Sequence, residues 1–317
     1  RYEAEKLALF SKVAKAYAQR HHLGRLISIH GGHLQLMKTM GGFVKTLYTV
    51  GKASHADTAK IQLEIARLED RITSLKERLP ASAAQLNALL GRRTDAPLPV
   101  PRDLPKRRPK LHLAQLKRSL RSRNPILREA RSLKRRYRSL EKKARFSPVP
   151  KIKLKFGFIE TGPAKMPNVA DSGKDALTAT IAFQIPILFG KYSAQREAAS
   201  ARASAARQTV QHRAKKLSAK LVWAYYTYRA AVRREKLLTR GLIPKAKETL
   251  TITQRALAHG EARFIDLLDA QKTLLRMEES LARVQRHVLV SLAAVAQLSG
   301  TTALGQDSPR QDKKETP

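Results

Sequence analysis

Hydrophobic residues recur along two stretches of the chain with the same alternating spacing of four and three residues. The first series has nine positions: Ile61, Ile65, Leu68, Ile72, Leu75, Leu79, Ser82, Leu86 and Leu89. The second series repeats that spacing: Ala270, Leu274, Met277, Leu281, Val284, Val288, Ser291, Val295 and Leu298. A repeat of about 3.5 residues is typical of a coiled-coil seam, so each stretch predicts a long helix that packs along its whole length.

The two series belong to an internal repeat. A shift of 209 residues aligns Gly51 with Gly260 and Asp57 with Asp266. In each copy a long helical pattern precedes the glycine, and the seam helix follows it. Because glycine allows the positive φ that a sharp reversal needs, each copy predicts an antiparallel helical hairpin.

Between the two copies the hydrophobic period changes to two. The apolar positions are Ile152, Leu154, Phe156, Phe158, Leu177, Ile181, Phe183 and Ile185. They alternate with a second set that includes Lys151, Lys153, Lys155, Thr178, Thr180 and Gln184. Two strands of about nine residues are long enough to cross a bilayer with tilt. A soluble hairpin that is buried on one face would have the same pattern.

These patterns predict a mainly α fold with a small β part. Prolines interrupt a basic segment between the first hairpin and the strands, and Pro244 is a candidate for a bend in the helix before the second turn. We expect six regions: a first helical hairpin over 1–91, a proline-rich linker over 92–123, a helix over 124–147, the strand pair and its loop over 148–189, a second helical hairpin over 190–300, and a disordered tail over 301–317.

The charge of the chain is strongly positive. Its 63 Lys and Arg residues exceed its 25 Asp and Glu residues, for a formal net charge of +38. Such an excess indicates an anionic partner or surface. One candidate is therefore a soluble basic coiled-coil protein that binds nucleic acid or another polyanion. That alternative leaves the repeat and the paired strands without an explanation.

The sequence contains no recognisable catalytic or cofactor-binding motif. There is no cysteine, no glycine-rich phosphate loop, no nucleophile elbow and no zinc-protease signature. His30 and His33 lack nearby carboxylates at ligand spacing, and Met37 and Met40 have the spacing of helix core residues. We expect no enzyme activity, no cofactor and no metal site.

Several stretches resemble one known family. They are "LAHGEARFIDLLDAQKTLL" (Leu257–Leu275), "LNALLGR" (Leu86–Arg92), "NPILREA" (Asn124–Ala130) and "FQIPILFG" (Phe183–Gly190). Together they resemble the TolC-like outer membrane efflux proteins of Gram-negative bacteria, and the resemblance runs from about Lys6 to Gly300. The segment Met166–Ala179 is similar to the heavy-metal branch, which exports copper and silver or cobalt, zinc and cadmium.

The resemblance implies a location, a function and partners. It implies a homotrimer in the outer membrane whose helices form a periplasmic tunnel and whose strands share one β-barrel. It also implies docking to a periplasmic adaptor protein and to an inner-membrane pump of the resistance-nodulation-division type. The trimer would be the exit duct for small molecules or metal ions. An adaptor itself would have one hairpin with lipoyl-like β domains, whereas this chain has two hairpins.

In that arrangement the two sets of strand residues have different surroundings. The apolar set would contact outer membrane lipid, and the polar set would line the barrel lumen. The family has two strand pairs per protomer, but only one pair is visible here. The other pair would precede residue 1, so we expect either a truncated chain or a divergent relative.

The resemblance also gives a role to acidic residues beyond the turns. Asp266 and Asp269 would point into the tunnel at its periplasmic constriction, where threefold symmetry makes rings of carboxylates that attract cations. Asp57 and Arg263 are candidates for polar links that hold the constriction closed, while Lys60 stands where the second copy has Asp269. The alternative is that these acids are solvated or stabilise the start of a helix.

The turns themselves resemble the tips that meet the adaptor. The first turn supplies Val50, Gly51 and Ala53, and the second supplies His259, Gly260 and Ala262. The alternative is that these small residues only close a turn.

Overall fold

The structure is a computed structural model that describes residues 2–51, 53–105, 108–163, 165–166, 173–185, 187 and 189–301, with the side chain of Phe189 left out. The tail expected over 301–317 therefore lies outside the described residues from position 302 onward, as does the middle of the loop between the strands. The chain divides into two compact units, which are Arg1–Ile126 with Ala214–Pro317, and Leu127–Arg213.

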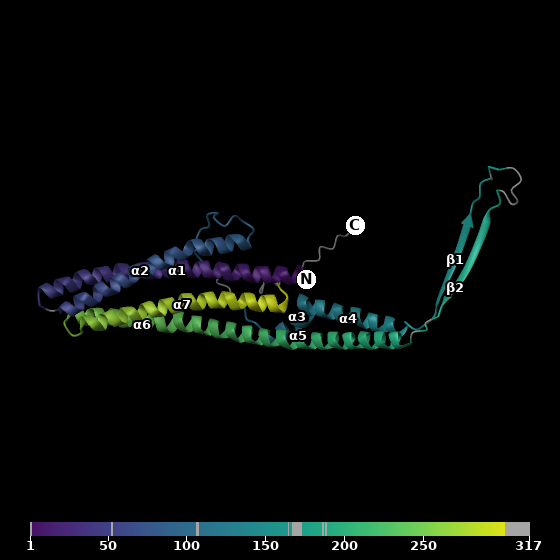
Figure 1. The fold of residues 1–317 in the computed structure, drawn as a ribbon. Coiled ribbons are helices and arrows are strands. Elements are labelled where there is room, and N and C mark those ends of the chain that lie inside the picture. The colour runs from purple at the N-terminus through teal and green to yellow at the C-terminus, as the bar shows by residue number, and fades with distance from the viewer. Residues whose placement is uncertain are drawn as a thin grey trace, which may run out of the picture. The chain divides into compact units, whose positions relative to one another are not determined.

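The first unit contains two antiparallel helical hairpins. Helices α1 (Tyr2–Thr49) and α2 (His55–Leu89) form one hairpin, and α6 (Ile243–Ala258) and α7 (Phe264–Ser299) form the other. Figure 1 shows the four helices side by side, with α1 packed against α2 and α7 and with α6 packed against α7. The predicted fold class, long helical hairpins with a small β part, is confirmed.

Both predicted seams lie inside the first unit. Every seam position of α2 and α7 is buried or half-buried. In α2 the seventh-residue series Ile61, Leu68 and Leu75 is buried, with exposed fractions of 0%, 6% and 1%, whereas the alternate positions Ile65 and Ile72 are half-buried. Between Ile61 and Leu79, one side of the α2 seam is therefore more deeply packed than the other, whereas further along Leu86 is buried and Leu89 is half-buried.

Glycines end the helices at matching places in the two copies. Gly51 and Gly260 close the turns with φ of 73° and 78°. Gly91 and Gly300, 40 residues further along in each copy, end α2 and α7 with φ of 68° and 79°. A residue with a Cβ is strained at such φ values, so the positions of glycine fix where each helix stops.

The long helix before the second turn is interrupted near Pro244. Helix α5 (Phe189–Leu237) passes into a π-helical turn, η1 (Leu238–Leu242), before α6 begins. The backbone N–H of Ile243 donates to the carbonyl of Leu238, five residues back. Proline has no N–H and its ring crowds the carbonyl four residues earlier, so the wider turn accommodates it at the start of α6.

The segment expected to be a linker is helical in its last third. Helix α3 (Leu113–Arg123) occupies residues assigned to the 92–123 linker. The prediction of an irregular segment was wrong there because no proline occurs between Pro109 and Pro125. Leu116 and Leu120 are one helical turn apart and buried, so α3 has an apolar stripe to pack.

The irregular part of the linker is held against the first hairpin by a buried arginine. The guanidinium of Arg20 donates to the carbonyls of Leu79, Leu98 and Pro99 and to the hydroxyl of Ser82. Arg20 is only 5% exposed, so these four oxygens take the place of water around its charge.

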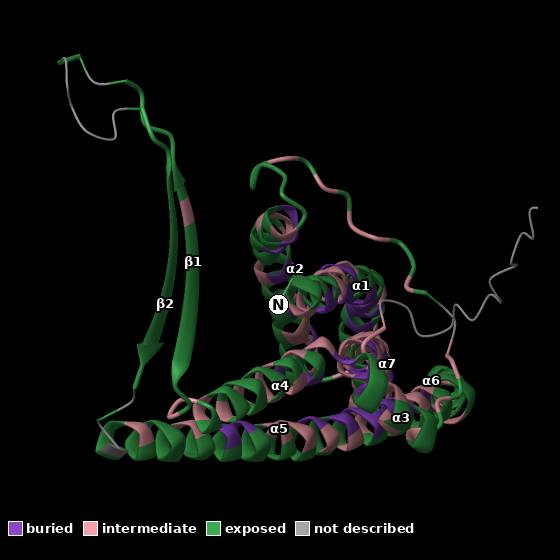
Figure 2. Ribbon diagram, turned by 90° about the vertical axis from the view of Figure 1, so that its right-hand side faces the viewer, coloured by how far each residue is buried: buried purple, intermediate pink, exposed green. Residues whose placement is uncertain are grey.

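The second unit contains the β-hairpin. Helix α4 (Pro125–Arg145) begins after Asn124, whose Oδ1 accepts a hydrogen bond from the N–H of Ile126. Strands β1 (Lys151–Ile159) and β2 (Ala176–Gln184) pair antiparallel. Figure 2 shows the strands exposed along almost their whole length. Within the described residues, no helix combines the length and apolar character needed to cross a membrane.

Candidate functional site

In the first turn, Asp57 and Ser54 cap the start of α2. Oδ2 of Asp57 accepts from the backbone N–H of Ser54 at 3.2 Å and from the Ser54 hydroxyl at 2.7 Å. The backbone N–H of Asp57 donates to Oγ of Ser54. This reciprocal capping box satisfies N–H groups that have no partner inside the helix. The hydrogen bond from the Ser54 side chain is the largest cause of the lowered pKa of Asp57.

In the second turn, Asp266 has the same position at the start of α7 but a charged partner. Its carboxylate accepts from the backbone N–H of Arg263 at 3.1 Å, and Arg263 Nη2 lies 3.3 Å from Oδ1. The pKa of Asp266 is lowered, mainly by the hydrogen bond from the Arg263 side chain. Arg263 also lowers the pKa of Asp57, so the two turns are close enough to interact electrostatically.

Asp269 lies one helical turn beyond Asp266 and makes weaker polar contacts than Asp266 does. Its side chain is 75% exposed, and its ion-pair contact is Arg276 Nη2 at a long 3.7 Å. A pair this exposed and this long contributes little. The Asp266 side chain is 46% exposed. Of the two aspartates predicted as a pair, Asp269 is therefore the one whose charge is freer to act on solutes.

The residues predicted as docking tips lie at the surface of the two turns. Val50 is 61% exposed, and Gly51, His259 and Gly260 are also exposed. Ala53 and Ala262 are half-buried. Exposed backbone and small side chains leave these turns accessible to a partner.

The strand register sorts the predicted strand residues onto two faces. Opposite residues in an antiparallel pair share a face, so Lys151 with Gln184 and Lys155 with Thr180 are on one side. Lys153 with Ala182 and Gly157 with Thr178 continue that polar face. The pairs Ile152 with Phe183, Leu154 with Ile181, Phe156 with Ala179, and Phe158 with Leu177 make the apolar face. The large residues on that face, with Ile185 just after β2, are 61–80% exposed.

A polar network between the two hairpins was not predicted. His33 of α1 is buried between Gln271 and Glu278 of α7. The Gln271 amide donates to Nδ1 at 2.7 Å, so Nε2 carries the ring proton and donates to Glu278 at 3.0 Å. This hydrogen bond is the largest cause of the lowered pKa of Glu278. The sequence contained a signal for this contact, because the number of residues from His33 to Gly51 equals the number from Gly260 to Glu278.

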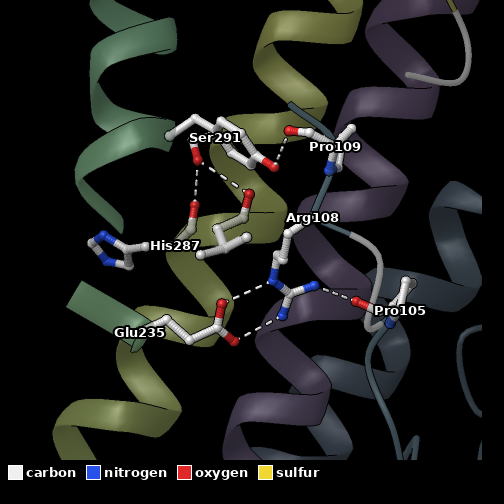
Figure 3. A network of polar contacts seen from close by, with 8 residues as sticks. Pro105, Arg108, Pro109, Glu235, His287 and Ser291 are labelled. Atoms are coloured by element: carbon white, nitrogen blue, oxygen red, sulfur yellow. Dashed lines mark hydrogen bonds and ion pairs between the residues drawn. The ribbon is translucent and has the colours of Figure 1, made fainter. Parts of the chain in front are cut away.

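A second network joins the linker to the helix before η1. Arg108 donates from Nε and Nη2 to the two carboxylate oxygens of Glu235, at 2.8 and 2.9 Å, and also to the carbonyl of Pro105 (Figure 3). The bidentate geometry fixes both partners, and the hydrogen bond that Arg108 donates to Glu235 raises the pKa of Arg108. Tyr228 reinforces the same link by donating to the carbonyl of Pro109 at 3.0 Å. No local pattern in the sequence pairs residues so far apart.

The structure offers no site for a bound metal within its described part. No group of three or more His, Asp or Glu side chains there could hold an ion. His30 lies 2.9 Å from Glu279, and His33 pairs with Glu278, so each histidine has one carboxylate neighbour from α7. Both pairs link helices.

Comparison with known families and structures adds three findings. A model of the family described as outer membrane efflux protein matches residues 116–301. Among solved structures, the outer membrane protein VceC from Vibrio cholerae is similar with a TM-score of 0.78 and 19% identity, over 94% of this chain and 71% of VceC. A comparison with curated proteins found no match.

Two further structures have comparable similarity. CusC matches with a TM-score of 0.81 and 18% identity, over 94% of this chain and 70% of CusC. The Neisseria gonorrhoeae MtrE outer membrane channel, in its open state, matches with a TM-score of 0.75 and 18% identity, over 95% of this chain and 67% of MtrE. Identities this low establish the fold alone, and the predicted assignment to the heavy-metal branch is not confirmed.

Proposed function

Since the chain belongs to the outer membrane efflux protein family, we propose that it is the outer-membrane exit duct of a tripartite efflux system. The observation that carries the proposal is the two-faced β-hairpin in a chain made mostly of long helical hairpins. Each strand has nine residues, which is the length that crosses a tilted bilayer. A solvent-exposed face of large apolar side chains on both strands needs a nonaqueous neighbour.

The proposal assigns each strand face an environment. The apolar face contacts the lipid of a Gram-negative outer membrane, and the lysine-rich face lines the lumen of a barrel completed by other copies of the chain. A barrel needs such partners because unpaired strand edges are not tolerated in lipid. The helical hairpins then extend the duct into the periplasm.

The remaining assignments concern partners and cargo. The exposed turns at Gly51 and Gly260 are the proposed docking tips for a periplasmic adaptor, which links the homotrimer to a resistance-nodulation-division pump. The cargo is small molecules or metal ions. The chain is proposed to transport them without acting as an enzyme.

The constriction is proposed to lie beyond these turns, with Asp269 as its main charge. In a homotrimer, Asp269 repeats three times, and such a ring of exposed carboxylates attracts cations and repels anions. Asp266 adds less, because its carboxylate accepts from the backbone of Arg263 and has the Arg263 guanidinium beside it. Arg263 and Asp57 interact at the turns and are candidates for contacts that keep the constriction closed.

Single-channel recording in a planar bilayer tests this proposal. We expect the full-length protein to conduct, and we expect Asp269→Asn to reduce cation preference, measured as reversal potential in a salt gradient, more than Asp266→Asn does. Asp70→Asn is the control, because Asp70 is an exposed aspartate of α2 that the proposal does not place at the constriction.

Two outcomes would contradict the proposal at different levels. Equal selectivity in wild type and Asp269→Asn would remove the constriction assignment while leaving the duct intact. A protein that stays soluble, forms no pore and binds DNA with a steep salt dependence would favour the basic coiled-coil alternative instead.

A further inference from the structure

A cavity of about 580 Å³ lies in the second unit, at the base of the β-hairpin. Its walls come from the end of α4, the start of α5 and the first pair of residues in the β-ladder, Lys151 and Gln184. Figure 2 shows both strands reaching the ends of these helices. Ser147, two residues after the end of α4, donates to Gln195 of α5 at 3.2 Å, so a hydrogen bond joins the segment before β1 to α5.

Three lysines from three different elements line this cavity. Lys143 is on α4, Lys151 is on β1 and Lys191 is on α5. All three are exposed, and none has a carboxylate partner among the residues that the structure describes. The described lining residues include no Asp or Glu. Three unpaired ammonium groups around one space attract an anion and can donate charge-assisted hydrogen bonds to it.

The cavity also has an apolar wall. Leu140, Phe146 and Val149 line it and are 42%, 72% and 53% exposed. Large apolar side chains grouped around a cavity mark a place where an apolar surface binds. Tyr192 adds a phenol ring to the same lining. The occupant with the best chemical fit therefore has both a negative group and an apolar part.

The register decides where the cavity opens. Lys151 and Gln184 belong to the polar face of the hairpin, which continues through Lys153 and Lys155. Under the proposed function that face lines the lumen, so the cavity opens where the tunnel passes into the barrel. A solute moving through the duct would meet Lys143, Lys151 and Lys191 before the two lysines further along β1.

We infer that this cavity binds organic anions that carry an aromatic ring or short apolar chain, at the barrel end of the duct. The inference rests on the proposed function and names a ligand class for that end. The Asp269 ring at the other end repels the same anions, so the cavity and the constriction select opposite charges. The lysines hold the negative group, while Phe146, Val149 and Leu140 contact the apolar part.

Block of the open channel by naphthalene-1-sulfonate tests the inference. We expect the probe to block the wild type, and we expect Lys143→Gln/Lys151→Gln/Lys191→Gln to raise the half-blocking concentration at least about tenfold. The charge-matched control is Lys142→Gln/Lys216→Gln/Lys220→Gln, which changes three exposed lysines outside the cavity and should leave block unchanged. Lys→Arg at the three cavity positions should retain block, which separates lost charge from misfolding.

Two other probes separate the parts of the site. Inorganic sulfate and neutral 1-naphthol should each block at least about tenfold more weakly than the sulfonate, because sulfate has no apolar part and 1-naphthol has no negative group. Phe146→Ala should weaken block by the sulfonate and leave block by sulfate unchanged. Equal block by sulfate, or equal weakening in the cavity and control variants, would overturn the inference and indicate diffuse attraction.

The test distinguishes failure of this site from failure of the duct. A wild-type channel that conducts but is not blocked by the sulfonate overturns the inference and leaves the proposed function standing. A protein that never conducts overturns the proposed function itself. A wild-type channel that is not blocked, and whose cavity residues cross-link between copies, would show that a second copy occupies the cavity, which also overturns the inference.

Discussion

The two helical hairpins have the same backbone plan but different surroundings. Both turn at a glycine with positive φ, and both start the returning helix with an aspartate that accepts a hydrogen bond from the backbone three residues earlier. Helix α2 packs mainly against α1, whereas α7 packs against α1, α6 and the π turn η1. The repeat therefore sets the shape of each hairpin, and the neighbours of each hairpin set which side chains are buried.

Equivalent positions show this difference residue by residue. Leu79 of α2 is half-buried, but its counterpart Val288 of α7 is 1% exposed. Gln62 is exposed, whereas its counterpart Gln271 is buried against His33. At the residue before the returning helix, the second turn has Arg263 where the first has Ser54. The same substitution can therefore be made at equivalent positions of the two repeat copies, where the backbone is alike and the surroundings differ.

A polar residue in the seam should give the largest difference. We expect Val288→Asn to lower the free energy of unfolding by about 3 kcal/mol, because it removes a buried apolar side chain and buries an amide without partners. Leu79→Asn, at the same repeat position, should cost about 1 kcal/mol because water reaches that side of α2. Thermal unfolding followed by far-ultraviolet circular dichroism measures both.

Equal costs for the two variants would contradict the one-sided packing of α2. That result would mean that another surface covers Leu79 in the assembled protein. Leu79→Ile, which keeps the apolar volume, is the control for a local change of shape.

The repeat explains how much of the fold could be predicted. The heptads at Ile61–Leu89 and Ala270–Leu298 predict that these segments are α-helices and which face of each helix packs. Gly51 and Gly260 predict where the chain reverses. These features therefore follow from local sequence. The π turn at Leu238–Leu242 could not be predicted, because Pro244 is compatible with a kink, a break or a wider turn. Helix α3 was not predicted, because the prolines that precede it led to the whole 92–123 segment being assigned as an irregular linker.

The candidate site was predictable to a smaller extent. The strand faces followed from alternation, and the register agrees with that alternation except at the last pair, Ile159 with Ala176, which is apolar and lies on the polar face. The roles of Asp57 and Asp266 as helix caps depend on turn geometry that their spacing alone did not settle. The hydrogen bonds between His33 and Gln271 and between Arg108 and Glu235 join residues that are far apart in the sequence. These contacts form only once the helices have packed, so a local sequence pattern does not predict them.

Removing the buried amide of α7 should have an intermediate effect. We expect Gln271→Leu to cost about 1–3 kcal/mol, because Nδ1 of buried His33 loses its donor. Gln62→Leu, the same change at the equivalent exposed position of α2, should change stability by no more than about 0.5 kcal/mol. Thermal unfolding of both variants measures the difference.

The variant Gln271→Leu/His33→Leu checks the cause of that effect. It leaves no buried ring nitrogen without its donor, but it also removes the hydrogen bond from His33 to Glu278. We therefore expect it to recover part of the lost stability, because Glu278 still reaches water. A double variant that is no more stable than Gln271→Leu would mean that Gln271 acts through its packing.

The smallest effect should come from the caps, where the two turns differ in the charge of the partner. The lowered pKa of Asp57 means that its stabilising contribution is complete above its ordinary value near 3.8 and is lost as the pH falls through the lower folded-state pKa. Asp57→Asn should thus lower the melting temperature at pH 7, by an amount equivalent to about 0.5–1 kcal/mol, and the difference from wild type should narrow below pH 4. Asp266→Asn should show the same pH dependence, since its pKa is also lowered.

Salt should separate the two turns. We expect 0.5 M NaCl to reduce the stability loss in Asp266→Asn, which involves the Arg263 charge, and to change the loss in Asp57→Asn less, because Ser54 is neutral. Identical salt responses would mean that the backbone cap alone carries the stabilisation in both turns, and that Arg263 is free to make a different contact.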